Sequence, residues 1–223
     1  TGERWYLIVV LICISLMTSD DEHCISKNEF FSRYLPEYFQ WEECMFESLQ
    51  VTPELVDKVI KPFSALAEHG VLVSAGHGTE RGEWNTMTAS WALMGHLWNR
   101  PMAVLFIRPQ RHTAVFAEEE DYLSVSFLDT ADEKMREALK ICGTVSGRDE
   151  DKAARAGITP VYHDNTVIGF EEAMLTVSCR KLYRSQFDMD LFLDPQVIID
   201  CYPKKDFHYV YFCEIRDAYL RSK

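Results

Sequence analysis

The chain has 223 residues, which is enough for one large domain with an appended segment. Hydrophobic residues make up 47% and aromatic residues 13%, so a sizeable core can form and bulk disorder is excluded. The formal net charge of −12 argues against nucleic acid as a partner, because a phosphate backbone requires clustered lysine and arginine.

Residues 1–52 differ in composition from the rest and are expected to form an N-terminal extension to a domain over 53–223. An apolar run at 5–17 is too short to span a bilayer comfortably, and it has only Arg4 before it and no small-residue cleavage site after it. We therefore expect a helical or poorly ordered extension of a cytoplasmic protein, with 30–49 as an amphipathic helix. Export or membrane association through 5–17 is the alternative.

The body begins with a helix predicted from Thr52 and Pro53 to about residue 60. A glycine-rich hairpin connection is predicted at 76–82, and Gly157 is expected to end a helix. The predicted strands are 71–74, 86–91, 102–107, 123–128, 166–168, 173–179, 188–193, 197–199 and 209–215. The predicted helices are 113–120, 131–141 and 146–156. This pattern predicts a mainly β protein, an antiparallel barrel with a few peripheral helices.

The seven cysteines and seven histidines show neither C-x-x-C nor H-x-x-x-H spacing. This spacing predicts no disulfide framework and no metal site, and it is typical of a reduced compartment. Cys142 could be redox-active near a helix N-terminus, but a small buried core residue is the simpler interpretation.

A run that follows Asn85 has small polar side chains at every second position. The polar positions are Thr86, Thr88 and Ser90, and the apolar positions are Met87, Ala89 and Trp91. Alternation predicts a strand with one polar face, whose backbone and hydroxyl groups a planar ligand could reach. An ordinary half-exposed strand is the alternative, because alternation is common.

An arginine turn directly follows the apolar strand at 102–107. It holds Arg108, Gln110 and Arg111 around a proline and is followed by His112 and Thr113. Arginine binds phosphate in a bidentate manner, so this turn is a candidate phosphate site. A solvated surface loop is the alternative.

A third segment, at 142–152, combines a predicted helix start with cations. Ser146 and Asp149 fit a capping box, which would open a helix whose N-terminal amides attract an anion. Arg148 and Lys152 add positive charge beside Gly147. A plain helix start with solvated charges is the alternative.

Together and in this order, these segments resemble the FMN-binding split-barrel flavin reductases, especially their flavoredoxin-like branch, over about residues 57–216. The resemblance rests on 60–63, 73–76, 85–91, 98–113, 142–152, 172–183 and 206–208. It implies a Greek-key split β-barrel, a homodimer, and FMN near the subunit interface. It also implies that Asn85 to Trp91 line the flavin. Phosphate and ribityl contacts would come from Arg108, Gln110, Arg111, Thr113, Ser146, Gly147 and Lys152.

The resemblance implies an FMN-dependent oxidoreductase that passes a hydride from NAD(P)H to bound flavin, and on to free flavin or a redox-protein acceptor. Such chemistry belongs to the cofactor, which agrees with the absence of a recognisable nucleophile or acid–base pair. An FMN-binding electron carrier without its own NAD(P)H site, or a non-enzymatic flavin-binding module, are the alternatives. Many split-barrel reductases carry Gly-Asp-His before the last strand. Here Phe207 separates Asp206 from His208, so a nicotinamide-contacting role does not transfer directly to His208.

Overall fold

The structure, a computed structural model, describes residues 46–50 and 62–222. The apolar run at 5–17 and the helix expected over 52–60 lie outside the described residues. In the described part of the chain, no helix is long and apolar enough to cross a membrane.

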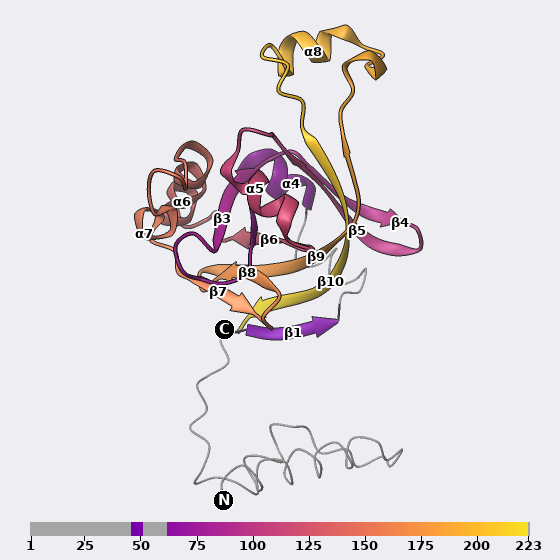
Figure 1. Cartoon of the computed structure of the whole chain (residues 1–223). Coiled ribbons are helices and arrows are strands. Elements are labelled where there is room, and N and C mark those ends of the chain that lie inside the picture. Colours follow the sequence, from indigo (N-terminus) through magenta and orange to yellow (C-terminus); the bar gives the residue numbers. More distant parts are fainter. Residues whose placement is uncertain (1–45, 51–61, 223) are drawn as a thin grey trace, which may run out of the picture. The chain divides into compact units, whose positions relative to one another are not determined.

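One antiparallel sheet of eight strands dominates the described residues (Figure 1). Its order is β3-β2-β6-β9-β10-β5-β4, and β1 also pairs with β10. The strands are β1 (Phe46–Gln50), β2 (Val71–Gly76), β3 (Trp84–Ala89), β4 (Ala92–Leu97), β5 (Arg100–Ile107), β6 (Tyr122–Leu128), β9 (Ala173–Gln186) and β10 (Tyr209–Arg221). A separate hairpin pairs β7 (Pro160–His163) with β8 (Val167–Phe170). The predicted mainly β class is confirmed.

The helices connect strands along the chain and lie outside the sheet itself. They are α4 (Pro62–Glu68), α5 (His112–Glu119), α6 (Glu133–Thr144), α7 (Lys152–Ala156) and α8 (Pro195–Cys201), with a 3₁₀ turn η2 (Met189–Leu191). The predicted helices at 113–120 and 131–141 correspond to α5 and α6. The C-cap predicted at Gly157 is also confirmed, because this residue has the left-handed φ of 65° that glycine favours.

Strand β2 is buried on both faces, which explains its continuous apolar sequence. Val71 and Val73 belong to the main core, which fills the inside of the sheet. Leu72 points the other way, into a second core beneath α6, α7 and β8 that also contains Leu139 and Phe170. This second core fixes α6 and α7 beside β3, where the groove described below forms.

Two predicted strands are wrong because local capping favours helical turns there. Residues 188–193 contain η2, where the Asp188 side chain accepts a hydrogen bond from the Asp190 amide. Residues 197–199 lie in α8, where Asp194 accepts from the Gln196 amide and Pro195 occupies the first turn. Acidic caps and an N-terminal proline outweigh the strand preference of Val197 and the isoleucines that follow.

The helix predicted to begin at Ser146 begins six positions later. Asp151 caps α7, and its side chain accepts from the Ala154 amide. Residues 147–149 form a turn instead, in which the Ser146 hydroxyl accepts from the Arg148 amide at 3.2 Å. The anion-binding helix start expected at Ser146 is therefore a loop, while Lys152 opens the helix itself.

Three strands were not predicted. β7 is only four residues long. β4 joins β5 through Trp98 and Asn99, both with left-handed φ, in a tight hairpin that lacks the usual glycine. β1 lies where the end of the amphipathic helix at 30–49 was expected, and it pairs with β10 from Phe46 to Gln50. The sheet thus begins before the domain boundary expected near residue 52, and the compact unit that contains it begins at Met45.

Between β9 and β10 the chain leaves the sheet as an arm, which we define as residues 187–206. It carries η2 and α8 and projects away from the strands at the top of Figure 1. Several of its apolar side chains are exposed, among them Leu191, Leu193 and Ile199. The arm returns to the sheet at Phe207 and His208, which are buried.

Candidate functional site

Three adjoining hollows form a groove along β3. The aromatic hollow, about 270 Å³, is lined by residues 87–91 together with Phe106, Arg108, Arg111 and His208. The cationic hollow, about 370 Å³, shares Met87, Arg108 and Arg111 with it. The outer hollow, about 690 Å³, shares His112, Arg148 and Lys152 with the cationic hollow. Because neighbouring hollows share lining residues, an extended ligand could occupy more than one of them.

β3 offers the groove an edge of the sheet, because it pairs only with β2 among the described strands. The Thr86 carbonyl accepts hydrogen bonds from Lys152 Nζ at 2.7 Å and from Asn85 Nδ2 at 3.2 Å. The Thr86 backbone therefore points away from β2, and the two-residue period of a strand gives Thr88 the same orientation. Backbone groups of this strand are thus directed toward the groove.

The hydroxyl groups of β3 do not serve the groove as expected. Thr86 is fully buried and lines none of the three hollows; its hydroxyl donates to the Val73 carbonyl and accepts from Ser74. Thr88 lines the aromatic hollow, but its hydroxyl donates to the Leu139 carbonyl in α6. The threonine hydroxyls of the predicted polar face therefore form hydrogen bonds within the protein. Of its three polar residues, only Ser90 is exposed.

Positive charge dominates the cationic hollow. Arg111, Arg148 and Lys152 line it, and within the described residues Asp206 is its only acidic lining residue. Arg111 donates to the Gly143 carbonyl at 2.8 Å and Arg148 donates to the Gln110 carbonyl at 3.3 Å. These bonds use one guanidinium nitrogen each, so further N–H groups remain for a ligand.

Lys152 is buried between α6 and β3. Its ammonium group donates to the carbonyls of Thr86 at 2.7 Å and Cys142 at 3.1 Å. Burial lowers its pKa to about 8 from the ordinary value of 10.5. An anion beside this amine would stabilise its protonated form, which burial destabilises.

A tight contact between Asn85 and Gly147 closes the inner wall. Asn85 Nδ2 donates to Thr113 Oγ1 at 2.7 Å, which holds the carboxamide in place. A Cβ atom on Gly147 would lie 2.0 Å from Asn85 Oδ1, so any larger residue there would have to displace this carboxamide. Asn85 and Gly147 line the outer hollow, while Thr113 and Ser146 line the cationic hollow.

The start of α5 supplies an unpartnered polar atom. Arg111, the N-cap residue, makes no capping hydrogen bond with its side chain, so the first amides of α5 are not capped by it. His112 Nδ1 is buried and has no hydrogen-bond partner within the described part of the chain. Burial, together with Arg148 and Lys152, lowers the His112 pKa. Cations, helix amides and an unpartnered buried nitrogen together fit a phosphate group.

Arg108 was expected to bind a phosphate, but its guanidinium already has partners within the protein. Its guanidinium forms an ion pair with Asp206 and donates to the Cys201 carbonyl at 2.9 Å. The same group lies 5.8 Å from the ring centre of Trp91 and 5.2 Å from that of Tyr202. Gln110 also donates to Asp206, at 2.6 Å. Arg108 and Gln110 therefore line the hollow while they hold the arm.

Aromatic rings form the far wall of the aromatic hollow. Trp91, which is 46% exposed and not part of the core, lies 5.2 Å from His208 between ring centres. His208 Nδ1 is hydrogen-bonded to the Tyr202 hydroxyl at 2.8 Å. Burial, and then Arg108, lower the His208 pKa to about 4, so its imidazole is neutral at neutral pH.

Most predicted residues thus meet in the groove, and some important ones were missed. The sequence pattern did not select His112 or Tyr202, although His112 directly follows the arginine turn and could have been chosen for its position at a helix start. Tyr202 gave no local signal, because it reaches the site only through the arm. Cys142 is fully buried and burial raises its pKa to about 11, which confirms the interpretation as a core residue.

The sequence profile of the "Flavin reductase like domain" family matches residues 63–223, and the chain belongs to this family. The fold is the split barrel of that family, as solved structures show. Flavoredoxin from Methanosarcina acetivorans is 21% identical, with 69% of each chain covered and a TM-score of 0.52. Flavoredoxin of Desulfovibrio vulgaris (Miyazaki F) is 20% identical, with 69% of each chain covered and a TM-score of 0.51.

A third similar structure is an FMN-binding domain of a flavin reductases-like enzyme from Shewanella baltica OS155. It is 16% identical, covers 79% of this chain and 78% of its own, and has a TM-score of 0.50. No curated protein matches the sequence significantly.

Proposed function

We propose that the groove binds FMN, with the phosphate in the cationic hollow and the flavin ring in the aromatic hollow. One observation carries this proposal: two hollows with complementary linings adjoin each other. The cationic hollow holds three cations and His112 Nδ1, which is buried and has no partner among the described residues. The aromatic hollow lies beside the open edge of β3. Arg111, Arg148 and Lys152 would hold the phosphate. The backbone edge from Met87 to Ser90 would orient the ring by hydrogen bonds.

We further propose an NAD(P)H-dependent, flavin reductase-like oxidoreductase with free flavin or a redox protein as acceptor. When bound, FMN would supply the hydride-accepting chemistry. The chain contributes position and environment. Trp91 and the neutral His208 present an uncharged aromatic surface beside the ring site. Arg108 and Asp206 keep the arm against one side of it.

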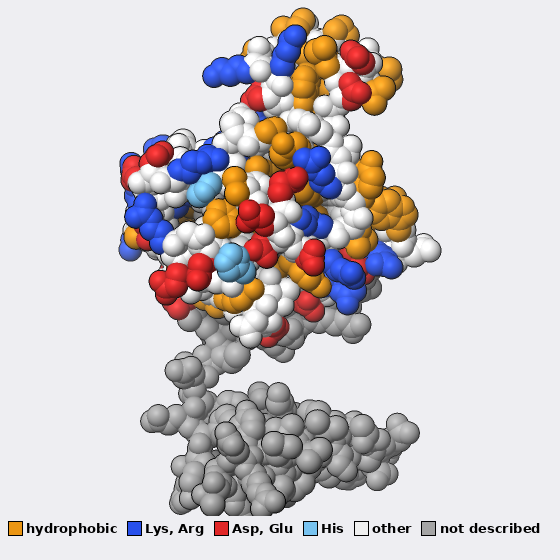
Figure 2. Space-filling view, in the orientation of Figure 1, with side chains coloured by type: hydrophobic (Ala, Val, Ile, Leu, Met, Phe, Trp, Pro, Cys, Tyr) orange, Lys and Arg blue, Asp and Glu red, His pale blue; other side chains and the backbone are white. Residues whose placement is uncertain are grey.

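A homodimer is part of the proposal, because large apolar side chains remain exposed at two places (Figure 2). Leu93 and Trp98 are exposed on the β4–β5 hairpin, and Leu191, Leu193 and Ile199 are exposed on the arm. Patches of this kind are typical of protein interfaces. Light scattering coupled to size-exclusion chromatography is expected to give twice the chain mass. A monomer at micromolar concentration would contradict the dimer without affecting the flavin site.

The main experiment is flavin reconstitution followed by reduction. The purified full-length chain is mixed with FMN, desalted, and heated to release the bound flavin for chromatography. We expect one FMN per chain and bleaching of its absorbance by NADH or NADPH under anaerobic conditions. Bleaching only by an added reductase would identify an electron carrier instead. A colourless chain that does not retain FMN would contradict the proposed function.

A further inference from the structure

The amine of Lys152 has one direction left for a ligand. Lys152 lines both the cationic hollow and the outer hollow. Its Nζ atom donates hydrogen bonds to the carbonyls of Thr86 at 2.7 Å and Cys142 at 3.1 Å. Besides its bond to the side chain, this nitrogen has three directions in which it can make contacts. Within the described part of the chain, no third hydrogen-bond acceptor occupies the last of them.

In its neutral form this amine is oriented as a nucleophile. A neutral amine has two N–H groups and one lone pair, and the carbonyls of Thr86 and Cys142 accept both N–H groups. The lone pair is then left in the remaining direction. Burial, with Arg111 as a nearby cation, lowers the Lys152 pKa to about 8. At about pH 7.5, about one amine in four is therefore neutral, against about one in a thousand for an ordinary lysine.

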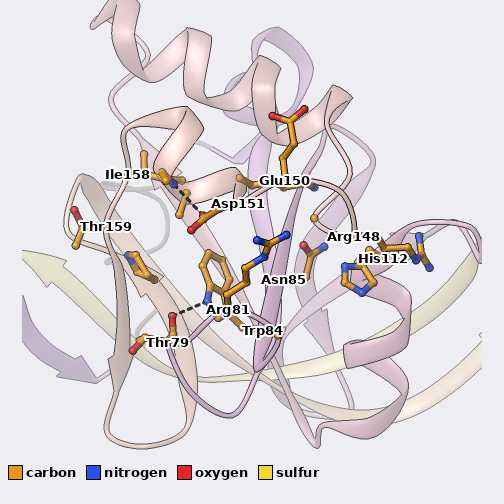
Figure 3. Close-up of a pocket in the computed structure, with 16 residues that line it drawn as sticks. Thr79, Arg81, Trp84, Asn85, His112, Arg148, Glu150, Asp151, Ile158 and Thr159 are labelled. Atoms are coloured by element: carbon orange, nitrogen blue, oxygen red, sulfur yellow. Dashed lines mark hydrogen bonds between the residues drawn. The ribbon is translucent and has the colours of Figure 1, made fainter.

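A phosphate site adjoins this amine. Arg111 and Arg148 line the cationic hollow together with Lys152, and each guanidinium uses only one nitrogen within the protein. His112 lies at the same end of the outer hollow as Arg148 (Figure 3), and its buried Nδ1 has no hydrogen-bond partner among the described residues. These groups can hold a phosphate by charge-assisted hydrogen bonds, which would bring a phosphorylated compound next to the amine.

The size of the cationic hollow and its charges restrict the class of electrophile. At about 370 Å³, the hollow suits a small compound. With the phosphate on the arginines, the amine reaches an electrophilic carbon only if this carbon is close to the phosphate. In an acyl phosphate the carbonyl carbon is bonded directly to a phosphate oxygen, and phosphate is also the leaving group. The cations that bind the phosphate would therefore also stabilise the negative charge that develops on it.

We propose that Lys152 is a modification site whose amine accepts an acyl group from a small acyl phosphate. Nζ of Lys152 attacks the carbonyl carbon, so that a C–N bond forms and the C–O bond to the phosphate breaks. The electron pair of that C–O bond leaves with inorganic phosphate, and the amine proton passes to water. The product is an amide, which has lost the positive charge of the lysine.

The consequence for the cofactor rests on the proposed function. Lys152 is one of the three cations assigned to the FMN phosphate, so the acylated chain should no longer retain FMN. Bound FMN should in turn protect the amine. Acyl phosphates would thus inactivate the flavin-free chain and leave the loaded chain intact.

The test incubates the flavin-free full-length chain with acetyl phosphate at about pH 7.5 and quantifies acetylated peptides by mass spectrometry. Lys140 is the internal reference, because it is exposed on α6 and lines none of the three hollows. We expect Lys152 to react about tenfold faster than Lys140 or more, because more of its amine is neutral. Inorganic phosphate should remove this advantage, and in urea the two rates should be equal.

Two arginine variants test the phosphate contact. Arg148→Ala should lower the ratio of the Lys152 rate to the Lys140 rate about tenfold, as expected for one lost charge-assisted contact. Arg180→Ala is the matched control and should leave the ratio unchanged, because Arg180 is exposed on β9 and lines none of the three hollows. Equal rates at the two lysines, no protection by phosphate, or equal effects of the two variants would overturn the modification site. Selective acetylation of Lys152 that FMN does not prevent would refute the proposed FMN site alone.

Discussion

At the scale of single residues, two arginines three positions apart have different partners. Arg108 is held by Asp206 and by the Cys201 carbonyl of the arm. Arg111 donates to the Gly143 carbonyl at the end of α6, on the side of the proposed phosphate. The sequence pattern gave both residues the same role, because it cannot show a pairing with a residue 98 positions away.

The two arginines should therefore differ in their effect on FMN. Arg111→Ala is expected to weaken FMN binding by about ten- to a hundredfold, since a lost charge-assisted hydrogen bond costs about 1.5–3 kcal/mol. Arg108→Ala should weaken it less, because its charge is already paired with Asp206. Quenching of flavin fluorescence during titration measures both affinities. Equal losses in the two variants would show that Arg108 also contacts the phosphate.

Lys152 should make FMN binding depend on pH. Its pKa of about 8 in the flavin-free chain means that it is protonated below that pH and neutral above it. Because the phosphate favours the ammonium form, FMN affinity is expected to fall as pH rises from about 7.5 to about 9.5. Lys152→Gln should bind FMN more weakly at neutral pH and lose this alkaline decline. The same decline in wild type and variant would assign the titration to another group.

At the scale of elements, the arm is held to the barrel mainly through Arg108, Gln110 and buried aromatic residues. Its return path includes the exposed residues Lys204 and Lys205. Arg108→Ala is expected to loosen this attachment and to accelerate tryptic cleavage after these lysines several-fold. Asp206→Asn should give the same effect, and Arg180→Ala should not. Unchanged cleavage in both variants would show that aromatic packing alone holds the arm.

Strand β1 should contribute to the stability of the barrel. Five of its residues pair with β10, from Phe46–Arg221 to Gln50–Asp217. We expect a fragment of residues 45–223 to unfold at the same temperature as the full chain. A fragment of 53–223 should unfold at least about 2 °C lower, since a loss of about 1 kcal/mol has that effect in a chain of this size. Equal midpoints would support the boundary expected near residue 52.

The elements that were predicted correctly are those whose local sequence agrees with their environment. β5 and β6 are apolar runs buried in the sheet, and the glycine-rich loop after β2 joins two paired strands. α8 was mistaken for a strand because its β-branched residues suggested one, although Asp194 and Pro195 cap a helix. In the groove, the residue types were predictable from the turn and the strand. The partners of these residues depend on tertiary contacts and could not be predicted from the sequence.

At the scale of the whole molecule, acid should destabilise the fold through two buried histidines. Burial lowers the pKa of His163 and of His208 to about 4, below the ordinary 6.5. Between these values the unfolded chain binds more protons, so stability falls as pH decreases from about 6.5 to about 4, by up to about 1.4 kcal/mol per pH unit for each histidine.

Urea unfolding at about pH 7 and about pH 5 measures this loss. His163→Gln is expected to reduce the difference between the two conditions, because one titrating group has been removed. A difference as large as in wild type would mean that His163 does not contribute to the acid sensitivity.

The central place of β10 also determines when this protein can fold during synthesis. β10 is synthesised after all the other described strands, yet it lies between β9 and β5 and also pairs with β1. Until Arg221 has emerged, β5 lacks one of its two neighbours and β1 lacks its pairing with β10. The nascent chain therefore exposes unpaired strand edges until β10 has emerged, a state in which chaperones bind and aggregation begins. The barrel should therefore close only after β10 has been synthesised, with this closure as the slow step of folding.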